Sequence, residues 1–385
     1  MALCLLAAGA LCLLIALHPF GTYPLSLLLL KRIRGRPVDD LPTVSEDAAS
    51  PDLAICMCAY NEERVIEAKL ANLLALKRAY PKLEILVYVD GASDRTPELL
   101  QPYADRIRLH ISKERHGKTH GMNLLVSMTK KPIVLFTDAN VMIDLQAPAR
   151  LMHHFADPAV GCVCGHLRYT NPGASVTAES GSLYWRLEEW TKRLESQTGS
   201  AIGADGSLFA IRRELHRAPP DHIIDDMFVS LTILCAGKRV VQSDDVDAYE
   251  ESVVASREEF SRKVRIACQA FNVHRLLWKD LRQLDGLRLY QYVSHKLIRW
   301  FTIYFLIASA LLIEAGLIAA GQIAVACSLL GLSGLVLIAG YYAWVRPAAQ
   351  IWDILTAFAG AGVGVLRSLR GDQFQTWSLA TSIRK

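Results

Sequence analysis

The sequence is poor in charge, and what it lacks excludes several classes of protein. Charged residues make up 21% of the 385 residues and hydrophobic residues 52%, and the mean hydropathy is +0.22. Soluble domains usually carry about 25% charged residues and less apolar content, so we expect part of this chain to lie in lipid. The composition excludes a disordered chain, a collagen and a coiled coil. The net charge of +4 is too small to indicate a nucleic-acid partner.

The nine cysteines do not have the spacing of a disulfide scaffold or a zinc site. No C-x2-C pair with a matching partner is present in the sequence. Cys56 and Cys58, like Cys162 and Cys164, alternate within apolar segments that are typical of strands. We therefore expect reduced cysteines with a structural role, because free cysteine is usually buried.

Long apolar runs occupy the two ends of the chain. Residues 2–30 contain no charged side chain, and Lys31, Arg32 and Arg34 follow at once. A signal peptide carries its charge before its apolar core, so we expect a transmembrane anchor at 1–30, followed by a basic flank and linker at 31–51. The positive-inside rule then places the N-terminus outside and residue 31 onward in the cytoplasm.

At the other end, apolar runs at 300–320 and 323–344 predict a transmembrane helical hairpin within 299–345. Arg299 and Arg346 flank this hairpin, so both of its ends are expected to face the cytoplasm.

The segments on either side of the hairpin are more polar. Residues 281–298 alternate leucines with basic residues, which fits an interfacial helix or a connector helix of the soluble domain. Residues 346–385 contain an apolar stretch with Gln350 and Asp353, followed by a basic tail. We expect a re-entrant or interfacial segment and a cytoplasmic tail there, because a spanning helix would place the basic tail outside.

Residues 52–280 have the pattern of a soluble α/β domain. Helical patterns separate strand-like runs at 53–59, 83–89, 106–111 and 132–137. Such alternation predicts a mostly parallel sheet, whose ligands bind beyond the carboxyl ends of the strands. Acidic or amide residues follow three of these four runs. The chain lacks the G-x-G-x-x-G of a dinucleotide fold and the complete G-x4-G-K-[ST] of a P-loop, so neither nucleotide site is expected.

Several polar motifs follow one another in this domain. They are A-Y-N-E-E at 59–63, V-D-G-A-S-D-R-T at 89–96, R-H-G-K at 115–118, T-D-A-N at 137–140, G-A-D-G-S at 203–207, D-D at 225–226 and R-K-V-R-I at 262–266. Each alone has a structural explanation, since Asn, Asp and Glu favour turns and helix starts. In this order they resemble family 2 glycosyltransferases, specifically the membrane-anchored branch that includes cellulose, chitin-oligosaccharide and poly-N-acetylglucosamine synthases.

The resemblance implies a GT-A-like fold, a Rossmann-related and mostly parallel sheet between N- and C-terminal transmembrane helices. It also implies a donor site, formed by Tyr60, Asn61, Glu62, Asp90, Lys118, Asp138, Arg262 and Arg265. In the family's pattern Asp90 accepts hydrogen bonds from the uracil ring, while Lys118 and Arg265 lie near the donor's diphosphate.

The T-D-A-N motif resembles the D-x-D element that holds a divalent metal, Mg²⁺ or Mn²⁺, on the donor's diphosphate. Carboxylate and amide oxygens suit such cations. Asn140 departs from the pattern because its amide carries no charge, so Asp138 is expected to be the stronger metal ligand of the two. A plain strand end is the alternative explanation of this segment.

The acceptor side is implied to contain Gly203, Asp205 and Asp225. Asp226 is expected to be the general base that takes the proton of the acceptor hydroxyl, unless it only starts a helix. With an ordinary carboxyl pKa near 3.9 it would be ionised at neutral pH. The family's tryptophan, which stacks on the acceptor sugar, is replaced by Ile266, and this weakens the case for processive polymerisation.

We therefore expect a membrane-bound, inverting hexosyl- or N-acetylhexosaminyltransferase. It would move a sugar from a UDP-sugar to a hydroxyl of a polysaccharide or lipid-linked glycan, as in exopolysaccharide biosynthesis. The expected setting is a bacterial inner or plasma membrane with the catalytic domain in the cytoplasm, and polysaccharide-export partners or a homo-oligomer are compatible with it.

Two alternative functions stay open. One is transfer to a simple lipid, such as a polyprenyl phosphate or a sphingolipid, and the other is a non-catalytic membrane protein that binds nucleotide sugars.

Overall fold

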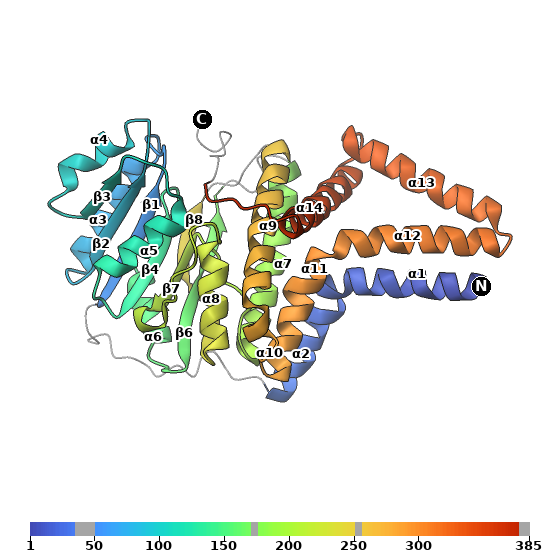
Figure 1. Cartoon of the computed structure of the whole chain (residues 1–385), viewed down its shortest axis with the longest axis horizontal. Coiled ribbons are helices and arrows are strands. Elements are labelled where there is room, and N and C mark those ends of the chain that lie inside the picture. The colour runs from blue at the N-terminus through green and yellow to red at the C-terminus, as the bar shows by residue number, and fades with distance from the viewer. Residues whose placement is uncertain (35–50, 171–175, 251–255, 377–385) are drawn as a thin grey trace.

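The computed structural model describes residues 1–34, 51–170, 176–250 and 256–376. Most of the linker expected at 31–51 and the end of the basic tail, with Arg384 and Lys385, lie outside the described residues. An α/β part and a bundle of apolar helices follow one another along the long axis of the molecule (Figure 1).

An eight-stranded sheet forms the centre of the α/β part, in the order β3-β2-β1-β4-β7-β6-β8-β5. The strands are β1 (Leu53–Ala59), β2 (Glu84–Asp90), β3 (Arg108–Ser112), β4 (Ile133–Asp138), β5 (Met142–Ile143), β6 (Val160–Tyr169), β7 (Leu208–Arg212) and β8 (Arg239–Glu250). β1 to β4 pair in parallel, and so do β6 and β8, whereas β7 and β5 are antiparallel to their neighbours. The four expected strands are therefore present within two residues of their predicted bounds, and the mostly parallel sheet is confirmed.

Helices cover both faces of this sheet. α3 (Ile66–Ala79) and α6 (Ala147–His154) contribute to the core on one face. α5 (Lys118–Met128), α8 (Asp225–Cys235) and α9 (Ser256–Leu281) contribute to the core on the other. β1 is buried along its whole length, because alternate residues such as Ile55 and Cys56 enter opposite cores. The strand cysteines are free and buried, as expected.

Four apolar helices are long enough to cross a membrane, which confirms a membrane protein. They are α1 (Ala2–Leu17) with its short extension to Phe20, α12 (Thr302–Ala319), α13 (Ile323–Tyr341) and α14 (Arg346–Leu369). α1 and α12 lie side by side, and Ser309 Oγ donates a hydrogen bond of 2.8 Å to the Gly9 carbonyl (Figure 1). The N-terminus and the turn between α12 and α13 lie together at the end farthest from the sheet (Figure 1).

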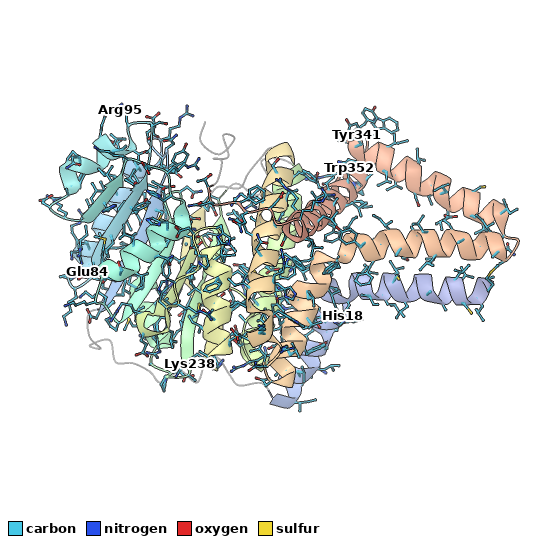
Figure 2. The ribbon with its side chains drawn as sticks, in the orientation of Figure 1. His18, Glu84, Arg95, Lys238, Tyr341 and Trp352 are labelled. Carbon is cyan, nitrogen blue, oxygen red and sulfur yellow. The ribbon has the colours of Figure 1, made fainter. Side chains whose placement is uncertain are left out.

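The anchor expected at 1–30 is divided in the structure. A 3₁₀ turn, η1 (His18–Phe20), contains Pro19 and separates α1 from α2 (Thr22–Arg34). Figure 2 shows His18 at this junction. α2 leaves the apolar bundle and packs on α7 (Val176–Thr198), where Tyr23 is fully buried and donates a hydrogen bond to Glu195. The apolar residues after the turn therefore pack against protein, and the candidate span ends at Phe20.

The two segments that flank the hairpin pack against the α/β part. Residues 281–298 form mainly α10 (Gly286–Tyr292) and the π-helical turn η4 (Val293–Leu297), which leads into α11 (Ile298–Trp300). Gln291 and His295 of this segment are buried, which favours a connector. α14 runs against α9, where a Cβ at Gly364 would lie 2.6 Å from the Ala267 Cβ. The interfacial or re-entrant character of α14 stays a prediction.

Candidate active site

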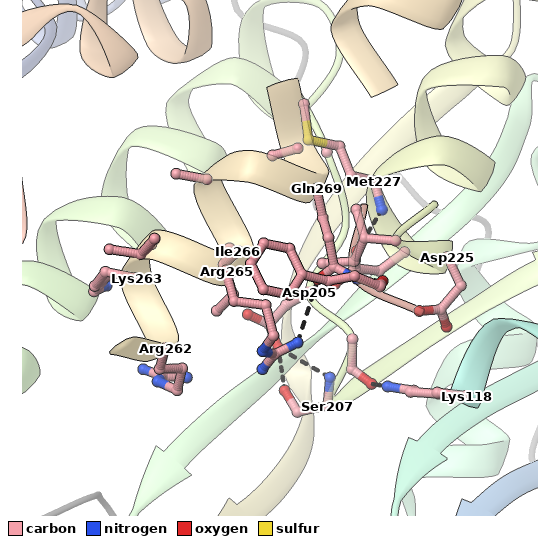
Figure 3. Close-up of a pocket in the computed structure, with 18 of the residues that line it drawn as sticks. Lys118, Asp205, Ser207, Asp225, Met227, Arg262, Lys263, Arg265, Ile266 and Gln269 are labelled. Carbon is pink, nitrogen blue, oxygen red and sulfur yellow. Dashed lines mark hydrogen bonds between the residues drawn. The ribbon is translucent and has the colours of Figure 1, made fainter. Parts of the chain in front are cut away.

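A cavity of about 1310 Å³ begins at the carboxyl ends of the strands and extends to α14. Its walls come from β4, the G-A-D-G-S loop, and helices α8, α9 and α14. Figure 3 shows Lys118 and Arg265 entering it from opposite sides. Most of the predicted site residues line it: Glu62, Lys118, Asp138, Asn140, Gly203, Asp205, Asp225, Asp226, Arg262, Arg265 and Ile266. The fold therefore brings these motifs together in one cavity.

The other three predicted residues, Tyr60, Asn61 and Asp90, do not line the cavity, and Asn61 donates from Nδ2 to Ser93 Oγ at 3.1 Å. Asp90 is fully buried and accepts hydrogen bonds from the backbone N–H groups of His116 and Gly117, at 2.7 and 3.0 Å. Arg115, which lines the cavity, places its guanidinium 3.6 Å from the centroid of the Tyr60 ring. These contacts hold the R-H-G-K loop in place, and the uracil-binding role of Asp90 stays a prediction.

Two charged groups, Lys118 and Asp226, lie beside Gly206, and Lys118 also bonds Asp138. Lys118 Nζ donates to Asp138 Oδ1 at 2.6 Å and to the Gly206 carbonyl at 3.3 Å. A Cβ at Gly206 would lie 2.8 Å from Asp226 Oδ2 and 3.2 Å from Lys118 Nζ. A side chain at this position would therefore displace the Asp226 carboxylate or the Lys118 ammonium group.

The two carboxylates at the start of α8 differ in their surroundings. Burial, and then the charge of Asp225, raise the pKa of Asp226 to about 7. The expectation that Asp226 is fully ionised at neutral pH is therefore wrong, because it assumed a solvated carboxyl group. Asp225 is 5% exposed, and its Oδ2 accepts no hydrogen bond within the described part of the chain.

The cations of the site remain charged beside these acids. Burial lowers the pKa of Lys118, but the nearby carboxylates of Asp138 and Asp225 outweigh it and raise that pKa above its ordinary value. Burial and the neighbouring Arg262 lower the pKa of Arg265, whose ordinary value is high enough that the guanidinium stays protonated. Its Nη1 donates to Gln269 Oε1 at 3.2 Å.

The residues near Asp138 are suited to a divalent cation. Asn140 lines the cavity and donates from Nδ2 to Glu250 Oε1 at 2.8 Å. Burial raises the pKa of Glu250 to about 7, and the charges of Asp138 and Asp205 add to this. In the described ranges no cluster of three or more His, Cys, Asp or Glu side chains forms a complete metal site. The oxygen donors therefore fit a cation that takes its remaining ligands from phosphates and water, as Mg²⁺ commonly does.

Glu250 was not anticipated from the sequence. It ends β8, whose S-D-D-V-D segment resembles a loop, so the strand that positions it was missed. The signal was an acidic residue at a strand end, the same pattern as Asp138.

Lys69 was missed too: it is fully buried in α3 and donates to Thr137 Oγ1 at 3.1 Å and to the Val141 carbonyl. It thus holds the T-D-A-N turn from behind.

A buried polar cluster joins the cavity to the N-terminal helices. His295 is 1% exposed and lies between Glu195 Oε1, at 2.8 Å, and Glu188 Oε2, at 3.1 Å. Lys296, which lines the cavity, donates to Glu188 at 2.9 Å. Because Tyr23 of α2 also bonds Glu195, the cavity wall and the membrane anchor are connected.

The chain after α14 returns to the R-H-G-K loop. Gln269 Nε2 donates to the Phe374 carbonyl at 2.7 Å, and Gln375 Nε2 donates to the His116 carbonyl at 2.9 Å. A Cβ at Gly117, whose φ is +94°, would lie 2.2 Å from the Gln375 carbonyl oxygen. Residues 371–376 therefore cover this loop, and nothing in the local sequence predicted that contact.

The comparison with known families agrees with this geometry. Residues 54–218 match the family described as Glycosyl transferase family 2. This segment is a family 2 glycosyltransferase domain. The match spans β1 to β7 and includes the motifs that supply Lys118, Asp138 and Asp205. α8, which carries Asp226, lies just beyond the matched residues of the family 2 domain.

Curated relatives share this domain. Poly-β-1,6-N-acetyl-D-glucosamine synthase of Staphylococcus aureus (strain COL) is 28% identical over 196 residues, which cover 49% of this chain and 47% of that one. The synthase of the same name from Staphylococcus epidermidis is 26% identical over 186 residues, 46% of this chain and 44% of that one. This chain thus aligns with about half the length of the curated relatives it matches.

A solved structure resembles the chain over nearly its whole length. It is the mannosyltransferase PcManGT from Pyrobaculum calidifontis, in complex with GDP-Man and Mn²⁺. It is 22% identical, with a TM-score of 0.71 over 93% of this chain and 99% of that one. The likeness confirms the expected GT-A-like fold and extends it beyond the family 2 domain.

Proposed function

We propose that the protein is a membrane-bound, inverting glycosyltransferase. It moves a sugar from a UDP-sugar to a hydroxyl of a membrane-associated acceptor, which is a polysaccharide or lipid-linked glycan or, as the alternative, a simple lipid. The observation that carries this proposal is that Lys118, which bonds Asp138, lies with Asp226 beside Gly206 in one cavity. The relatives that make poly-N-acetylglucosamine support the donor class, and PcManGT adds GDP-mannose to the donors worth testing.

The chemistry follows from the positions of the charged groups. Asp226 takes the proton of the acceptor hydroxyl while its oxygen forms a bond to the anomeric carbon. The bond between that carbon and the diphosphate breaks on the opposite face, and the nucleoside diphosphate leaves with the electron pair. This direct displacement inverts the anomeric centre. Lys118 and Arg265 stabilise the negative charge that develops on the diphosphate.

A divalent cation fits the same site. Asp138 and Asn140 would hold it, and it would act as a Lewis acid that offsets phosphate charge. Lys118 Nζ lies 2.6 Å from Asp138 Oδ1, so its ammonium group would lie near the same phosphates.

The setting is part of the proposal. The basic residues Lys31, Arg32 and Arg34 at the end of α2 support a cytoplasmic position for the α/β domain, because basic flanks stay inside. A bacterial inner or plasma membrane is the expected location, and nucleotide sugars are available on its cytoplasmic side.

The first experiment measures nucleoside diphosphate release by the purified full-length protein. UDP-sugars and GDP-mannose are supplied in turn, with and without Mg²⁺ or Mn²⁺, in the presence of a membrane extract as acceptor source. We expect release with one donor and an increase with the cation. No release with any donor would instead favour a non-catalytic nucleotide-sugar-binding protein.

The second experiment replaces the proposed base. Asp226→Asn should lower transfer by about 10²- to 10⁴-fold, the usual contribution of a general base, while donor binding stays unchanged. Asp221→Asn is the matched control, because this acid precedes α8, pairs with His120 and does not line the cavity. Undiminished transfer by Asp226→Asn would overturn the assignment.

A further inference from the structure

The cavity continues past the reacting groups to the membrane helices. Ala357, Phe358 and Ala361 of α14 line its far end, together with Trp300 of α11. The Phe358 ring lies 5.1 Å from the ring of Phe20, in the turn where the N-terminal span ends. The part of this wall that α14 supplies therefore belongs to a helix long and apolar enough to cross a bilayer.

Apolar side chains also line the path between these two ends. Met227 and Ile266 lie close to the reacting groups, as Figure 3 shows, and Val264 and Ala270 continue the wall along α9. Phe260 is 39% exposed and lines the cavity. These apolar side chains can cover an alkyl or isoprenoid chain, since apolar burial contributes about 25 cal/mol per Å². Lys296, Arg299 and Arg367 line the same cavity and suit a polar headgroup.

The size of the cavity allows two molecules. A typical ligand pocket has a volume of about 300–1,000 Å³, and this cavity has about 1310 Å³. A nucleotide sugar at the strand ends thus leaves room for the headgroup and first part of a second ligand near α14.

The cavity does not continue between the apolar helices α1, α12 and α13. Among the described residues, none of those that line the cavity belongs to α1, α12 or α13. Ser309, a polar residue buried within this bundle, bonds the Gly9 carbonyl between α1 and α12. A growing polysaccharide would need a polar passage across the bilayer, and the cavity does not extend into one.

The proposed general base, Asp226, favours an acceptor that reacts through a hydroxyl group. A lipid phosphate is already deprotonated at neutral pH and needs no base, whereas a hydroxyl loses its proton during attack. The Asp226 carboxylate lies beside Gly206, where it can take that proton.

We propose that the acceptor is a membrane lipid with a free hydroxyl in its headgroup, which enters sideways from the bilayer beside α14. Its chain lies along α9 and α14, and its hydroxyl reaches Asp226. This inference rests on the transferase activity proposed above. It replaces the glycan acceptor with a small lipid and predicts a product that carries one or a few sugars.

The test uses the full-length protein in vesicles made from total bacterial lipid, with the radiolabelled donor that passes the release assay. Reaction products are divided into an organic-soluble fraction and an ethanol-insoluble polymer fraction, and the lipid is identified by mass spectrometry. A sugar-bearing hydroxyl lipid supports the proposal. A polymer would overturn the lipid acceptor but not the transferase activity. A glycosyl phosphate lipid, recognised because mild acid cleaves it, would do the same. Absence of donor turnover refutes the transferase itself.

Variants of α14 test the route of the lipid. Ala361→Trp fills the far end of the cavity and should lower lipid glycosylation by about 10-fold or more, as overpacking at such sites does, without changing donor binding. Ile354→Trp is the matched control, because Ile354 is on the same helix, is exposed and does not line the cavity. If Ala361→Trp does not fold, Ala357→Leu makes a smaller obstruction at the same wall. Unchanged lipid glycosylation in a folded variant would overturn the proposed route.

Discussion

At the scale of single residues, the site depends on how closely opposite charges approach. Gly206 allows Lys118 and Asp226 to approach the space where a Cβ would lie, and Asp225 adds a second carboxylate at the start of the same helix as Asp226. The surroundings of Asp226 therefore bring its pKa to about 7, close to the pH at which the cell works.

The pH dependence of transfer follows from this pKa. Asp226 must be ionised to accept a proton, so the rate should rise as the pH increases through about 7. Asp225→Asn removes a neighbouring negative charge, which lowers the pKa of Asp226 and moves the acid limb of the profile to lower pH. The measurement is the rate against pH for both proteins.

Glu250→Gln is the control for that profile. Glu250 also has a pKa raised to about 7, but Asp226 is not among the groups that raise it. The acid limb should stay in place in this variant. The role of Asp226 would be contradicted if Glu250→Gln shifted the acid limb of the pH profile and Asp225→Asn left it unchanged.

Gly206→Ala tests the close approach directly. The new methyl group would lie 2.8 Å from Asp226 Oδ2 and 3.2 Å from Lys118 Nζ, so one of them must move. We expect a fall in turnover of about 100-fold, since small misplacements of reacting groups have such effects, with little change in the melting temperature. Gly286→Ala is the control, because nothing lies within 4 Å of its Cβ position. Equal turnover in both variants would show that the approach is not needed.

The residue types of this site could be predicted, but not their environment. Asp226 and Lys118 stood in recognisable motifs, whereas the pKa of Asp226 depends on burial by segments far away in the sequence. Lys69 lies in an ordinary helical pattern, and only the fold shows that its ammonium group supports the T-D-A-N turn.

At the scale of elements, the membrane bundle depends on small residues where helices touch. A Cβ at Gly9 would lie 2.7 Å from Ile313, and a Cβ at Gly316 would lie 2.8 Å from Leu6. α1 and α12 can therefore pack closely, as helices in lipid commonly do through glycine.

Gly9→Leu should separate these two helices. We expect a loss of about 1–3 kcal/mol in the free energy of unfolding, the usual effect of overpacking, measured as a lower melting temperature in detergent. Gly331→Leu is the matched control in α13, where nothing lies within 4 Å of the Cβ position. An equal shift in both variants would mean that the packing of α1 on α12 is not the cause.

Elements whose burial is local were predicted well. β1, β2 and β4 are continuous apolar runs, and the sequence located them closely. β8 could not be found in this way, because it becomes a strand only by pairing with β6. The candidate span is shorter than the anchor expected at 1–30 for a related reason. The residues after Gly21 form α2, which packs on α7, more than a hundred residues later.

At the scale of the whole molecule, the long axis separates the sheet from the N-terminus and the α12–α13 turn (Figure 1). Figure 2 shows Arg95 at the sheet end, while Tyr341 and Trp352 lie close together where α13 meets α14. Their rings are 5.4 Å apart, and Tyr341 is largely exposed, as expected for an aromatic pair at a membrane interface.

The proposed sidedness can be measured with a pair of cysteine variants. Both variants are made after the free cysteines that are not buried, Cys4, Cys12, Cys235 and Cys327, have been replaced by serine. Gln322→Cys then places a thiol at the α12–α13 turn, and Arg95→Cys places one on the exposed surface of the α/β part. A membrane-impermeant maleimide should label the first in intact cells and the second only after the membrane is opened. The reverse pattern would place the α/β part outside and contradict a cytoplasmic active site.

The membrane ends and the middle domain were predicted from composition, but the cavity they share was not. It is lined by residues from Cys58 to Thr376, so no local pattern describes it. The contact between Phe20 and Phe358 shows the same limit, since its partners are near opposite ends of the chain.

The pairing of α1 with α12 also affects how the protein is made. The hydrogen bond from Ser309 to Gly9 joins residues 300 positions apart. A ribosome adds about 5–20 residues per second, so that distance corresponds to roughly 15–60 s of synthesis. α1 is therefore made long before its partner exists, and the α/β domain is synthesised during that interval. Completion of the membrane bundle is a late event, and a chain that stops before α12 leaves Gly9 without its partner.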